Sequence, residues 1–313
     1  MRAAVVPVYG PPEVVEIRDI DRPEPGPKQV LVRVVAAAVT SGDARIRGAR
    51  FPDGFGALSR LAFGWRRPRR PVLGGVVSGT VAALGAKVDG FAVGDEVAGM
   101  TGTAMGTHAQ YVAIPAKKLT HKPPTVSHSD AAGVLFGGSA ALHFLRSVDT
   151  GANTTVLVNG ASGAIGTNAV QIAKHLDATV TAVTSGSNAA LVTDLGADDV
   201  IDYTSVDLAA TKRRFDVVLD TVGNLDPASA ARLLTDSGTA VLAAATLAEN
   251  VIPRRRVKAG VAPERAEDFA HLMSLVADGT LRVVRDDIGL DDIVDAHRRI
   301  DSGRKVGNIV VHP

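Results

Sequence analysis

The chain has 313 residues, more than the roughly 250–300 that one hydrophobic core usually holds, so two domains are expected. Hydrophobic residues make up 46% and charged residues 21%, a balance typical of soluble globular proteins. The 34 lysines and arginines against 33 aspartates and glutamates leave a net charge of +1. This charge argues against a dedicated nucleic-acid or membrane-surface protein, although it allows local basic patches.

The sequence contains no cysteine, which excludes disulfides, thiolate catalysis and cysteine-ligated zinc. Its 8 histidines include no pair at the spacing of metal ligands, so we expect no metal site. The N-terminus does not resemble a signal peptide, because Pro7, Pro11 and Pro12 interrupt its apolar residues. No apolar run approaches the ~18–20 residues that cross a bilayer. A cytoplasmic protein is therefore the expectation.

The first third of the chain predicts short strands separated by proline and glycine. The strongest is Val30–Ala37, in which valine dominates. The pattern continues through Val5–Val8, Val14–Arg18, Pro71–Ala83, Ala92–Ala98 and His108–Ile114, with a turn at Gly94-Asp95 before a strand at Glu96–Gly99. Together they predict a mostly β domain over residues 1–120.

The next part alternates strands and helices, which indicates βαβ units and a doubly wound parallel sheet over residues 121–278. The expected strands are Thr155–Asn159, Thr179–Thr184, Asp199–Ile201, Asp216–Asp220 and Thr239–Ala244. The expected helices are Ser129–Ser147, Gly163–Leu176, a segment from Asn188 that stops at Gly196, and Pro263–Ala277. A strand at Leu281–Val284, a helix near Leu290–Ile300 and a strand at Asn308–Val311 follow. Their β character predicts that residues 279–313 return to the first domain, so the fold class is α/β.

A glycine-rich loop, Gly160–Gly166, lies between a buried strand and a helix. In that setting such a loop indicates a dinucleotide site, and the alternative is a plain tight turn. Gly160 and Gly163 would let the chain turn sharply and a pyrophosphate approach the backbone, while Gly166 would let the helix pack against the strand. The phosphates would then face the free N–H groups and the positive end of the helix.

The position that selects between NADH and NADPH lies about 20 residues past the loop, at the end of the second strand. An NAD-specific site places Asp or Glu there, but this chain has Thr184, Ser185 and Ser187. Small hydroxyl residues leave room for a 2′-phosphate and donate hydrogen bonds to it, whereas a carboxylate would repel it. The sequence therefore favours NADPH, although no Arg or Lys adjoins these residues.

Several further segments match one known family when taken together: Val39–Asp43 with Arg47-Gly48, Gly85–Val88, Phe91–Val97, Gly106–Val112, Phe136–Leu145, Leu195–Tyr203 and Gly303–Val311. Over nearly its whole length the chain resembles the zinc-independent medium-chain dehydrogenase/reductases, and most of all the quinone oxidoreductases of the zeta-crystallin type. The resemblance implies a GroES-like catalytic domain from the two chain ends, a central Rossmann domain, and an active site in the cleft between them. It also implies NADPH-dependent reduction of quinones or α,β-unsaturated carbonyls. A homodimer is implied as well, with Thr239–Ala244 and Arg256–Val261 as interface candidates.

The resemblance places Tyr203 beside the adenosine phosphate, and Asp220–Gly223 and Ala243–Thr246 against the cofactor. The expected cofactor-binding residues are therefore Gly160, Ala161, Ser162, Gly163, Ala164, Ile165, Gly166, Thr184, Ser185, Ser187, Tyr203, Val222, Ala244 and Ala245. The family's basic residue for the 2′-phosphate falls on Ser187, and Arg304 or Lys305 is the candidate substitute.

Three residues are candidates for the reaction itself: Thr40, Asp43 and His108. Thr40 follows a buried strand and either offers a hydroxyl near the nicotinamide or only forms a turn. Asp43 either orients a donor or caps a short helix at Ala44–Arg47. His108 either relays a proton near neutral pH or is structural. The family usually carries Asn at the position of Thr40 and Tyr at that of His108, so the proton donor and the substrate stay open.

Two arginine clusters stand out, Trp65–Arg70 and Arg254–Arg256. The first could receive an anionic substrate, a coenzyme A tail or an acyl-carrier protein, or could simply be solvated charge. It motivates an alternative function, an enoyl-thioester reductase or a reductase of a specialised metabolite. The altered positions Thr40, His108 and Ala140 motivate another, a nucleotide-binding protein without catalysis. Aromatic residues make up only 4%, so nucleic acid is not an expected partner.

Overall fold

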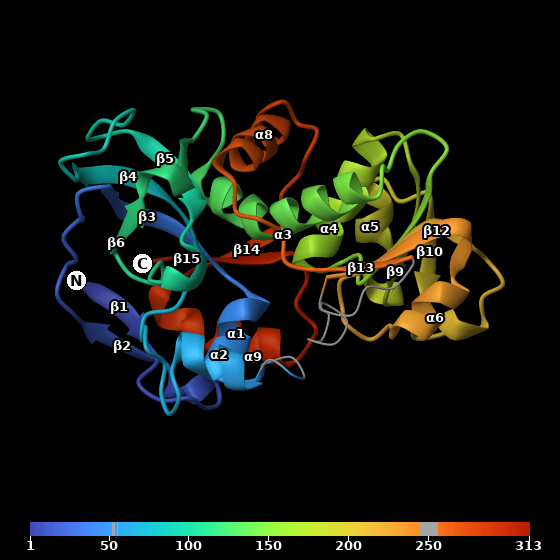
Figure 1. Cartoon of the computed structure of the whole chain (residues 1–313), viewed down its shortest axis with the longest axis horizontal. Coiled ribbons are helices and arrows are strands. Elements are labelled where there is room, and N and C mark those ends of the chain that lie inside the picture. Colours follow the sequence, from blue (N-terminus) through green and yellow to red (C-terminus); the bar gives the residue numbers. More distant parts are fainter. Residues whose placement is uncertain (52–53, 55, 244–255) are drawn as a thin grey trace.

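The computed structural model describes residues 1–51, 54, 56–243 and 256–313, and Figure 1 shows two lobes side by side along the long axis. The terminal lobe contains both chain ends. Its strands are β1 (Arg2–Val5), β2 (Glu16–Asp19), β3 (Gln29–Val39), β4 (Val76–Leu84), β5 (Glu96–Met100), β6 (Tyr111–Pro115), β7 (Leu119–His121), β14 (Arg285–Gly289) and β15 (Asn308–His312). Its helices are α1 (Ser41–Arg47), α2 (Gly56–Phe63) and α9 (Ile293–Asp301).

Strand β3 organises the terminal lobe, because it pairs antiparallel with β4, β6 and β15. The sheet runs in the order β14-β15-β3-β4-β5-β7, and β1 and β2 form a separate pair. The last strand, β15, is parallel to β14 and antiparallel to β3, so the tail of the chain lies in the terminal lobe.

The central lobe holds a parallel sheet. Its strands are β8 (Thr155–Asn159), β9 (Thr179–Thr184), β10 (Asp199–Asp202), β11 (Phe215–Asp220), β12 (Leu234–Leu242) and β13 (Val257–Ala259). Their order in the sheet is β10-β9-β8-β11-β12-β13. The chain adds β9 and β10 on one side of β8 and then β11, β12 and β13 on the other, so the strand order reverses between β8 and β11. The helices are α3 (His128–Ser147), α4 (Ala164–His175), α5 (Ala189–Asp194), α6 (Pro227–Arg232) and α8 (Ala266–Ala277). This doubly wound sheet confirms the predicted fold class, and ligands of such sheets bind where the strand order reverses.

Helix α3 joins the two lobes, contacting α4 and α8 on one side and β3, β4 and β15 on the other. It crosses α4 closely at Gly137, where an added Cβ would lie 2.1 Å from the Ala164 carbonyl oxygen. One hydrophobic cluster contains Ala38 and Met100 of the terminal lobe as well as Leu219 of the central lobe. The lobes therefore share part of one core.

Some predicted elements shift at their ends. Strand β1 covers Arg2–Val5, whereas the sequence predicted a strand at Val5–Val8. After Val5 the backbone leaves the pair with β2, and Val6 N donates to the Pro71 carbonyl instead. The strand predicted at Leu281–Val284 is wrong. Arg282 N donates to Gln171 Oε1 at 2.8 Å, and Gln171 Nε2 donates to the Arg282 carbonyl at 3.0 Å. The backbone of Arg282 is therefore not free to pair with a strand, and the strand begins only at Arg285. The predicted stop of α5 is confirmed, because Gly196 has φ +104°.

Short 3-10 turns complete the fold at Pro12–Val14, Gly102–Ala104, Ala116–Lys118, Gly186–Asn188, Leu208–Ala210 and Leu290–Asp292. Among the described residues, none of the helices combines the length and the apolar character needed to cross a membrane.

Candidate active site

The glycine-rich loop connects β8 to α4 at the point where the strand order reverses. Gly160 has φ +80°, a conformation that favours glycine. An added Cβ on Gly166 would lie 2.2 Å from the Gly160 carbonyl oxygen, so packing within the loop requires this glycine. Gly163 is the N-cap of α4 and offers no side chain to its first turn. The first N–H groups of α4 thus lack intrahelical partners and can bind an anion.

A cavity of about 730 Å³ opens at this loop, and we call it the loop cleft. The predicted cofactor residues that line it are Gly160, Ser162, Gly163, Ala164, Ile165, Thr184, Tyr203 and Val222. Ala161 and Gly166 are buried behind the loop, and Ser185 and Ser187 lie beside the cleft without lining it. Ala244 and Ala245 lie outside the described residues.

Hydroxyl groups connect the loop to the end of β9. Ser162 Oγ accepts hydrogen bonds from Thr184 Oγ1 at 2.9 Å and from Asn188 Nδ2 at 3.3 Å. Asn188 Nδ2 also donates to Ser185 Oγ at 3.1 Å, and the hydroxyls of Ser185 and Ser187 are 3.0 Å apart. The cluster is neutral and rich in donors, the chemistry that a ribose phosphate requires. Asn188 was not among the predicted site residues.

An acid that sequence reasoning missed lies next to this cluster. An added Cβ on Gly186 would lie 2.6 Å from Asp202 Oδ2. Hydrogen bonds from the Thr204 hydroxyl and backbone lower the pKa of Asp202, so its carboxylate is charged at neutral pH. Asp202 ends β10, the strand beside β9, and only the parallel pairing of these two strands brings it to this corner.

Lys305 supplies positive charge to the loop cleft, which it lines. Burial, aided by the charge of Arg299, lowers the pKa of Lys305 to about 8. Its Nζ donates to the Gly307 carbonyl, and Gly307 N in turn donates to the Ser162 carbonyl at 2.8 Å. The tail therefore touches the glycine loop. Arg304, the other predicted substitute for a phosphate-binding residue, is exposed and does not line the cleft.

Thr40 is the N-cap of α1, and Asp43 completes a capping box with it. Asp43 Oδ2 accepts hydrogen bonds from Thr40 N at 2.8 Å and from Thr40 Oγ1 at 2.7 Å, and Asp43 Oδ1 accepts from Gly74 N at 2.9 Å. The carboxylate is buried, with 1% of Asp43 exposed. Asp43 therefore both caps the helix and orients the Thr40 hydroxyl, and α1 begins at Ser41 rather than at Ala44.

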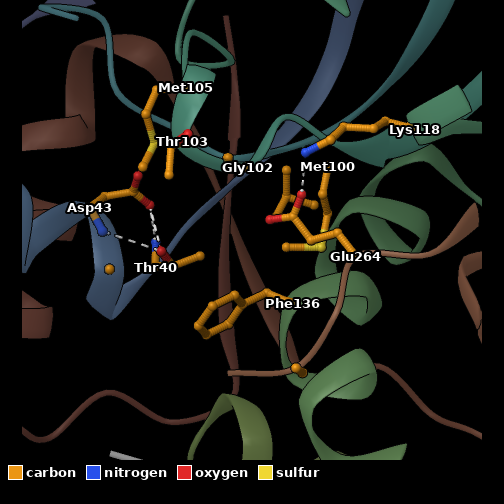
Figure 2. Close-up of a pocket in the computed structure, with 13 residues that line it drawn as sticks. Thr40, Asp43, Met100, Gly102, Thr103, Met105, Lys118, Phe136 and Glu264 are labelled. Carbon is orange, nitrogen blue, oxygen red and sulfur yellow. Dashed lines mark hydrogen bonds and ion pairs between the residues drawn. The ribbon is translucent and has the colours of Figure 1, made fainter. Parts of the chain in front are cut away.

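A second cavity of about 500 Å³ lies on the other side of Thr40 (Figure 2), and we call it the inner cavity. Thr40 and Phe136 line both cavities, so the loop cleft and the inner cavity meet at these two residues. The inner cavity has apolar walls from Val76, Met100, Met105, Phe136 and Ala262. It has room for a small apolar ligand directly beside the loop cleft.

Across the inner cavity from Thr40, Figure 2 shows Lys118 paired with Glu264. Lys118 Nζ lies 2.9 Å from Glu264 Oε2, and both side chains are about three-quarters buried. Lys118 is the cationic side chain of this cavity among the described residues. An ammonium group has three donors, so one bond to Glu264 leaves two for a ligand oxygen.

His108 does not reach either cavity. It is 1% exposed, its Nε2 lies 3.1 Å from the Ala38 carbonyl oxygen, and the backbone of Gly74 packs on its ring. The prediction of a catalytic His108 therefore conflicts with its position, which is structural. His297 is also buried, and its burial lowers the pKa of its imidazole to about 4.

Sequence reasoning also missed Phe136, Lys118 and Glu264. The signal for Phe136 was the adjacent Gly137-Gly138 interruption, which marks the close crossing of α3 and α4 beside the cleft. Lys118 and Glu264 are 146 residues apart in the chain, and no local pattern connects them.

The comparisons with known proteins agree with this geometry. Residues 26–124 match the family described as alcohol dehydrogenase GroES-like domain, and residues 195–311 match the family described as zinc-binding dehydrogenase. The second description names zinc, yet the chain has no cysteine. Across the described ranges, no three His, Asp or Glu side chains gather into a group that could hold a metal ion. The residues therefore do not fit a zinc site.

Three similar proteins carry related names. The chain is 28% identical to the chloroplastic NADPH-dependent alkenal/one oxidoreductase of Arabidopsis thaliana, over 100% of this chain and 80% of that protein. It is 28% identical to a quinone oxidoreductase of Pseudomonas aeruginosa over 97% of each chain. The solved quinone oxidoreductase of Coxiella burnetii superposes with a TM-score of 0.91 at 28% identity, covering 100% of this chain and 99% of that one.

Proposed function

Because the chain belongs to the medium-chain dehydrogenase/reductase family, we propose that it is an NADPH-dependent oxidoreductase acting on quinones or α,β-unsaturated carbonyls. One observation carries the proposal: the loop cleft and the inner cavity meet at Thr40 and Phe136. A dinucleotide on the glycine loop would extend its reactive end to this junction, and a planar electrophile in the inner cavity would face it.

The loop residues fit such a cofactor. The free N–H groups at the start of α4 suit a pyrophosphate, and Lys305 adds a charge on the same cleft. The donors of Ser162, Ser185 and Asn188 suit the 2′-phosphate of NADPH, whereas the charged Asp202 nearby would oppose it. The preference for NADPH therefore rests on the balance between these hydroxyl groups and one carboxylate.

NADPH would supply the hydride, and the protein positions the reactants and stabilises charge. Thr40 Oγ1 already donates its proton to Asp43, so its remaining capacity is that of an acceptor. Thr40 therefore suits holding an N–H group, such as a carboxamide, at the junction. The negative charge that develops on the substrate oxygen needs a donor, and Lys118 on the inner cavity meets that need. The final proton comes from Lys118 or from water.

The test is an NADPH-oxidation screen over quinones, enones and enoyl thioesters in the presence of a metal chelator. We expect turnover of quinones or enones that survives chelation. Turnover of thioesters alone would favour the enoyl-thioester alternative, and tight NADPH binding with no oxidation of it by any acceptor would favour the non-catalytic one. A matched pair, Thr40→Ser and Thr40→Val, separates the hydroxyl from the shape of the side chain. We expect the serine variant to retain activity and the valine variant to lose it.

We also propose a homodimer. Among the described strands β13 lies at an edge of the central sheet, whereas β12 lies inside it, so Thr239–Leu242 is not a free edge. Val261 follows β13 and is 90% exposed. Sedimentation equilibrium should show a dimer, and Val261→Lys should shift the protein towards the monomer.

A further inference from the structure

An exposed basic surface stands at the C-terminal end of α2. It consists of Leu61, Trp65, Arg66, Arg67, Arg69 and Arg70, and we call it the basic patch. Leu61 is 66% exposed and Trp65 is 65% exposed. In the part of the chain that the structure describes, no carboxylate forms an ion pair with any of the four arginines. The sequence contains no Asp or Glu anywhere in residues 54–88, so the charge of the basic patch is locally unbalanced.

Hydrogen bonds hold the backbone beneath the basic patch in place. The Tyr9 hydroxyl donates to the Gly64 carbonyl at 2.7 Å, and Arg60 Nη1 donates to the Trp65 carbonyl at 2.7 Å. Arg69 N donates to the Phe63 carbonyl at 2.6 Å, which closes the turn after α2. The exposed indole therefore stands on an anchored turn. An exposed side chain of this size forgoes the free energy of burial, which a binding partner would recover.

We propose that the basic patch docks the protein on a bilayer that contains anionic phospholipids. Trp65 and Leu61 enter the boundary between headgroups and acyl chains, where amphipathic aromatic rings are favoured. Arg66, Arg67 and their two neighbours bind the lipid phosphates, each contributing about 1 kcal/mol near an anionic surface. The net charge of +1 does not indicate this basic surface, because the acidic residues that balance the arginines lie in other parts of the chain.

The size of the basic patch favours a lipid surface over an acidic protein. A stable protein interface takes about 20–30 residues from each side. The basic patch presents six side chains from residues 61–70, and four of them are guanidinium groups. Docking on a bilayer needs only such a cluster of cations with an aromatic anchor.

Trp65 is the only tryptophan in the chain, so its fluorescence reports on the basic patch alone. The protein is mixed with vesicles of equal parts phosphatidylcholine and phosphatidylglycerol, and with vesicles of phosphatidylcholine alone. We expect co-sedimentation with the anionic vesicles only, a blue shift of the Trp65 emission, and a loss of both as salt is raised. Because ~1 kcal/mol per arginine corresponds to about fivefold in affinity, the double variant Arg66→Gln, Arg67→Gln should bind about thirtyfold more weakly.

The matched control removes the same charge elsewhere. Lys212 and Arg214 are exposed on the central lobe, and their double replacement by glutamine should leave vesicle binding unchanged. Equal losses of vesicle affinity in both double variants would show that binding depends only on the total charge of the protein, and this would overturn the proposal. Binding to anionic vesicles with an unshifted Trp65 emission would also overturn it, as would the absence of vesicle binding together with saturable binding to an acidic protein. The vesicle-binding assay contains no quinone, enone or NADPH, so its result does not depend on whether the protein catalyses the proposed reaction.

Discussion

Lys118 Nζ lies 2.9 Å from Glu264 Oε2, and this ion pair connects the two lobes across one wall of the inner cavity. Lys118 ends the 3-10 turn between β6 and β7, whereas Glu264 precedes α8. Partial burial strengthens the pair relative to an exposed one, and Glu264 balances the charge of Lys118.

Replacing Lys118 by methionine should lower kcat for quinone reduction about 10²-fold, the loss typical when a donor to a developing oxyanion is removed. Lys118→Arg should retain most of the activity because it keeps the charge. Glu264→Gln should keep or raise kcat, since Lys118 is then free for the substrate. Stopped-flow oxidation of NADPH measures these rates, and the Kd for NADPH should stay constant. A fully active Lys118→Met variant would remove Lys118 from the mechanism.

Gly163→Val should retain the fold after a shift of a few tenths of an ångström at Gly160, and it should lose NADPH binding. Gly163 has φ −79°, which any residue adopts, and an added Cβ would lie 3.3 Å from the nearest atom, the Gly160 carbonyl oxygen. The side chain would instead block the pyrophosphate. Hydrogen bonds to a charged group contribute about 1.5–3 kcal/mol each, so affinity should fall at least tenfold. Fluorescence titration measures the affinity and circular dichroism the fold. In contrast, Gly166→Ala should destabilise the protein itself.

Ser185→Asp should shift the preference from NADPH towards NADH. The substitution replaces a donor by a carboxylate beside Ser162 and Asn188, and the lost bond alone should cost tenfold or more in NADPH affinity. Asp202→Asn should act in the opposite direction, because it removes a negative charge that opposes the 2′-phosphate. The ratio of kcat/KM for the two cofactors is the measurement. An unchanged ratio in both variants would show that the 2′-phosphate binds elsewhere.

Acid should destabilise the protein through His297. Its pKa is about 4 in the folded chain and 6.5 when exposed, so the unfolded chain binds the extra proton as pH falls between these values. Stability is therefore present above pH 6.5 and is lost progressively towards pH 4, by up to about 3 kcal/mol. Urea unfolding at several pH values should show this slope in the native protein and in the control His175→Gln. His297→Leu should flatten it.

The parts of the site that could be predicted are those formed by residues close together in the sequence. The glycine loop, its strand and its helix are contiguous, so their spacing predicted the anion site. Thr40 and Asp43 are three residues apart, and their capping box follows from that spacing. By contrast, the position of His108 depends on contacts with Gly74 and Ala38, which are distant in the sequence. These contacts bury the His108 side chain, which a proton relay would need to expose to the site.

The same limit applies to the missed residues. Asp202 reaches the phosphate corner through the pairing of β10 with β9, and Glu264 reaches Lys118 through the packing of the lobes. Neither relationship leaves a periodic signal. Residue types alone also concealed the role of Thr40, because only the hydrogen bond to Asp43 shows that its proton is already engaged.

The return of β15 to the terminal lobe has a consequence for how the chain is made. A ribosome delivers residues in sequence order, so β3 can pair with β15 only after the strands of the parallel sheet, which lie between them in the chain, have emerged. The parallel sheet between them consists of consecutive units and can close earlier. When β15 pairs with β3, the neighbouring Gly307 donates its backbone N–H to the Ser162 carbonyl of the glycine loop. A chain truncated before Gly307 should therefore form its central sheet yet leave the glycine loop without this hydrogen bond.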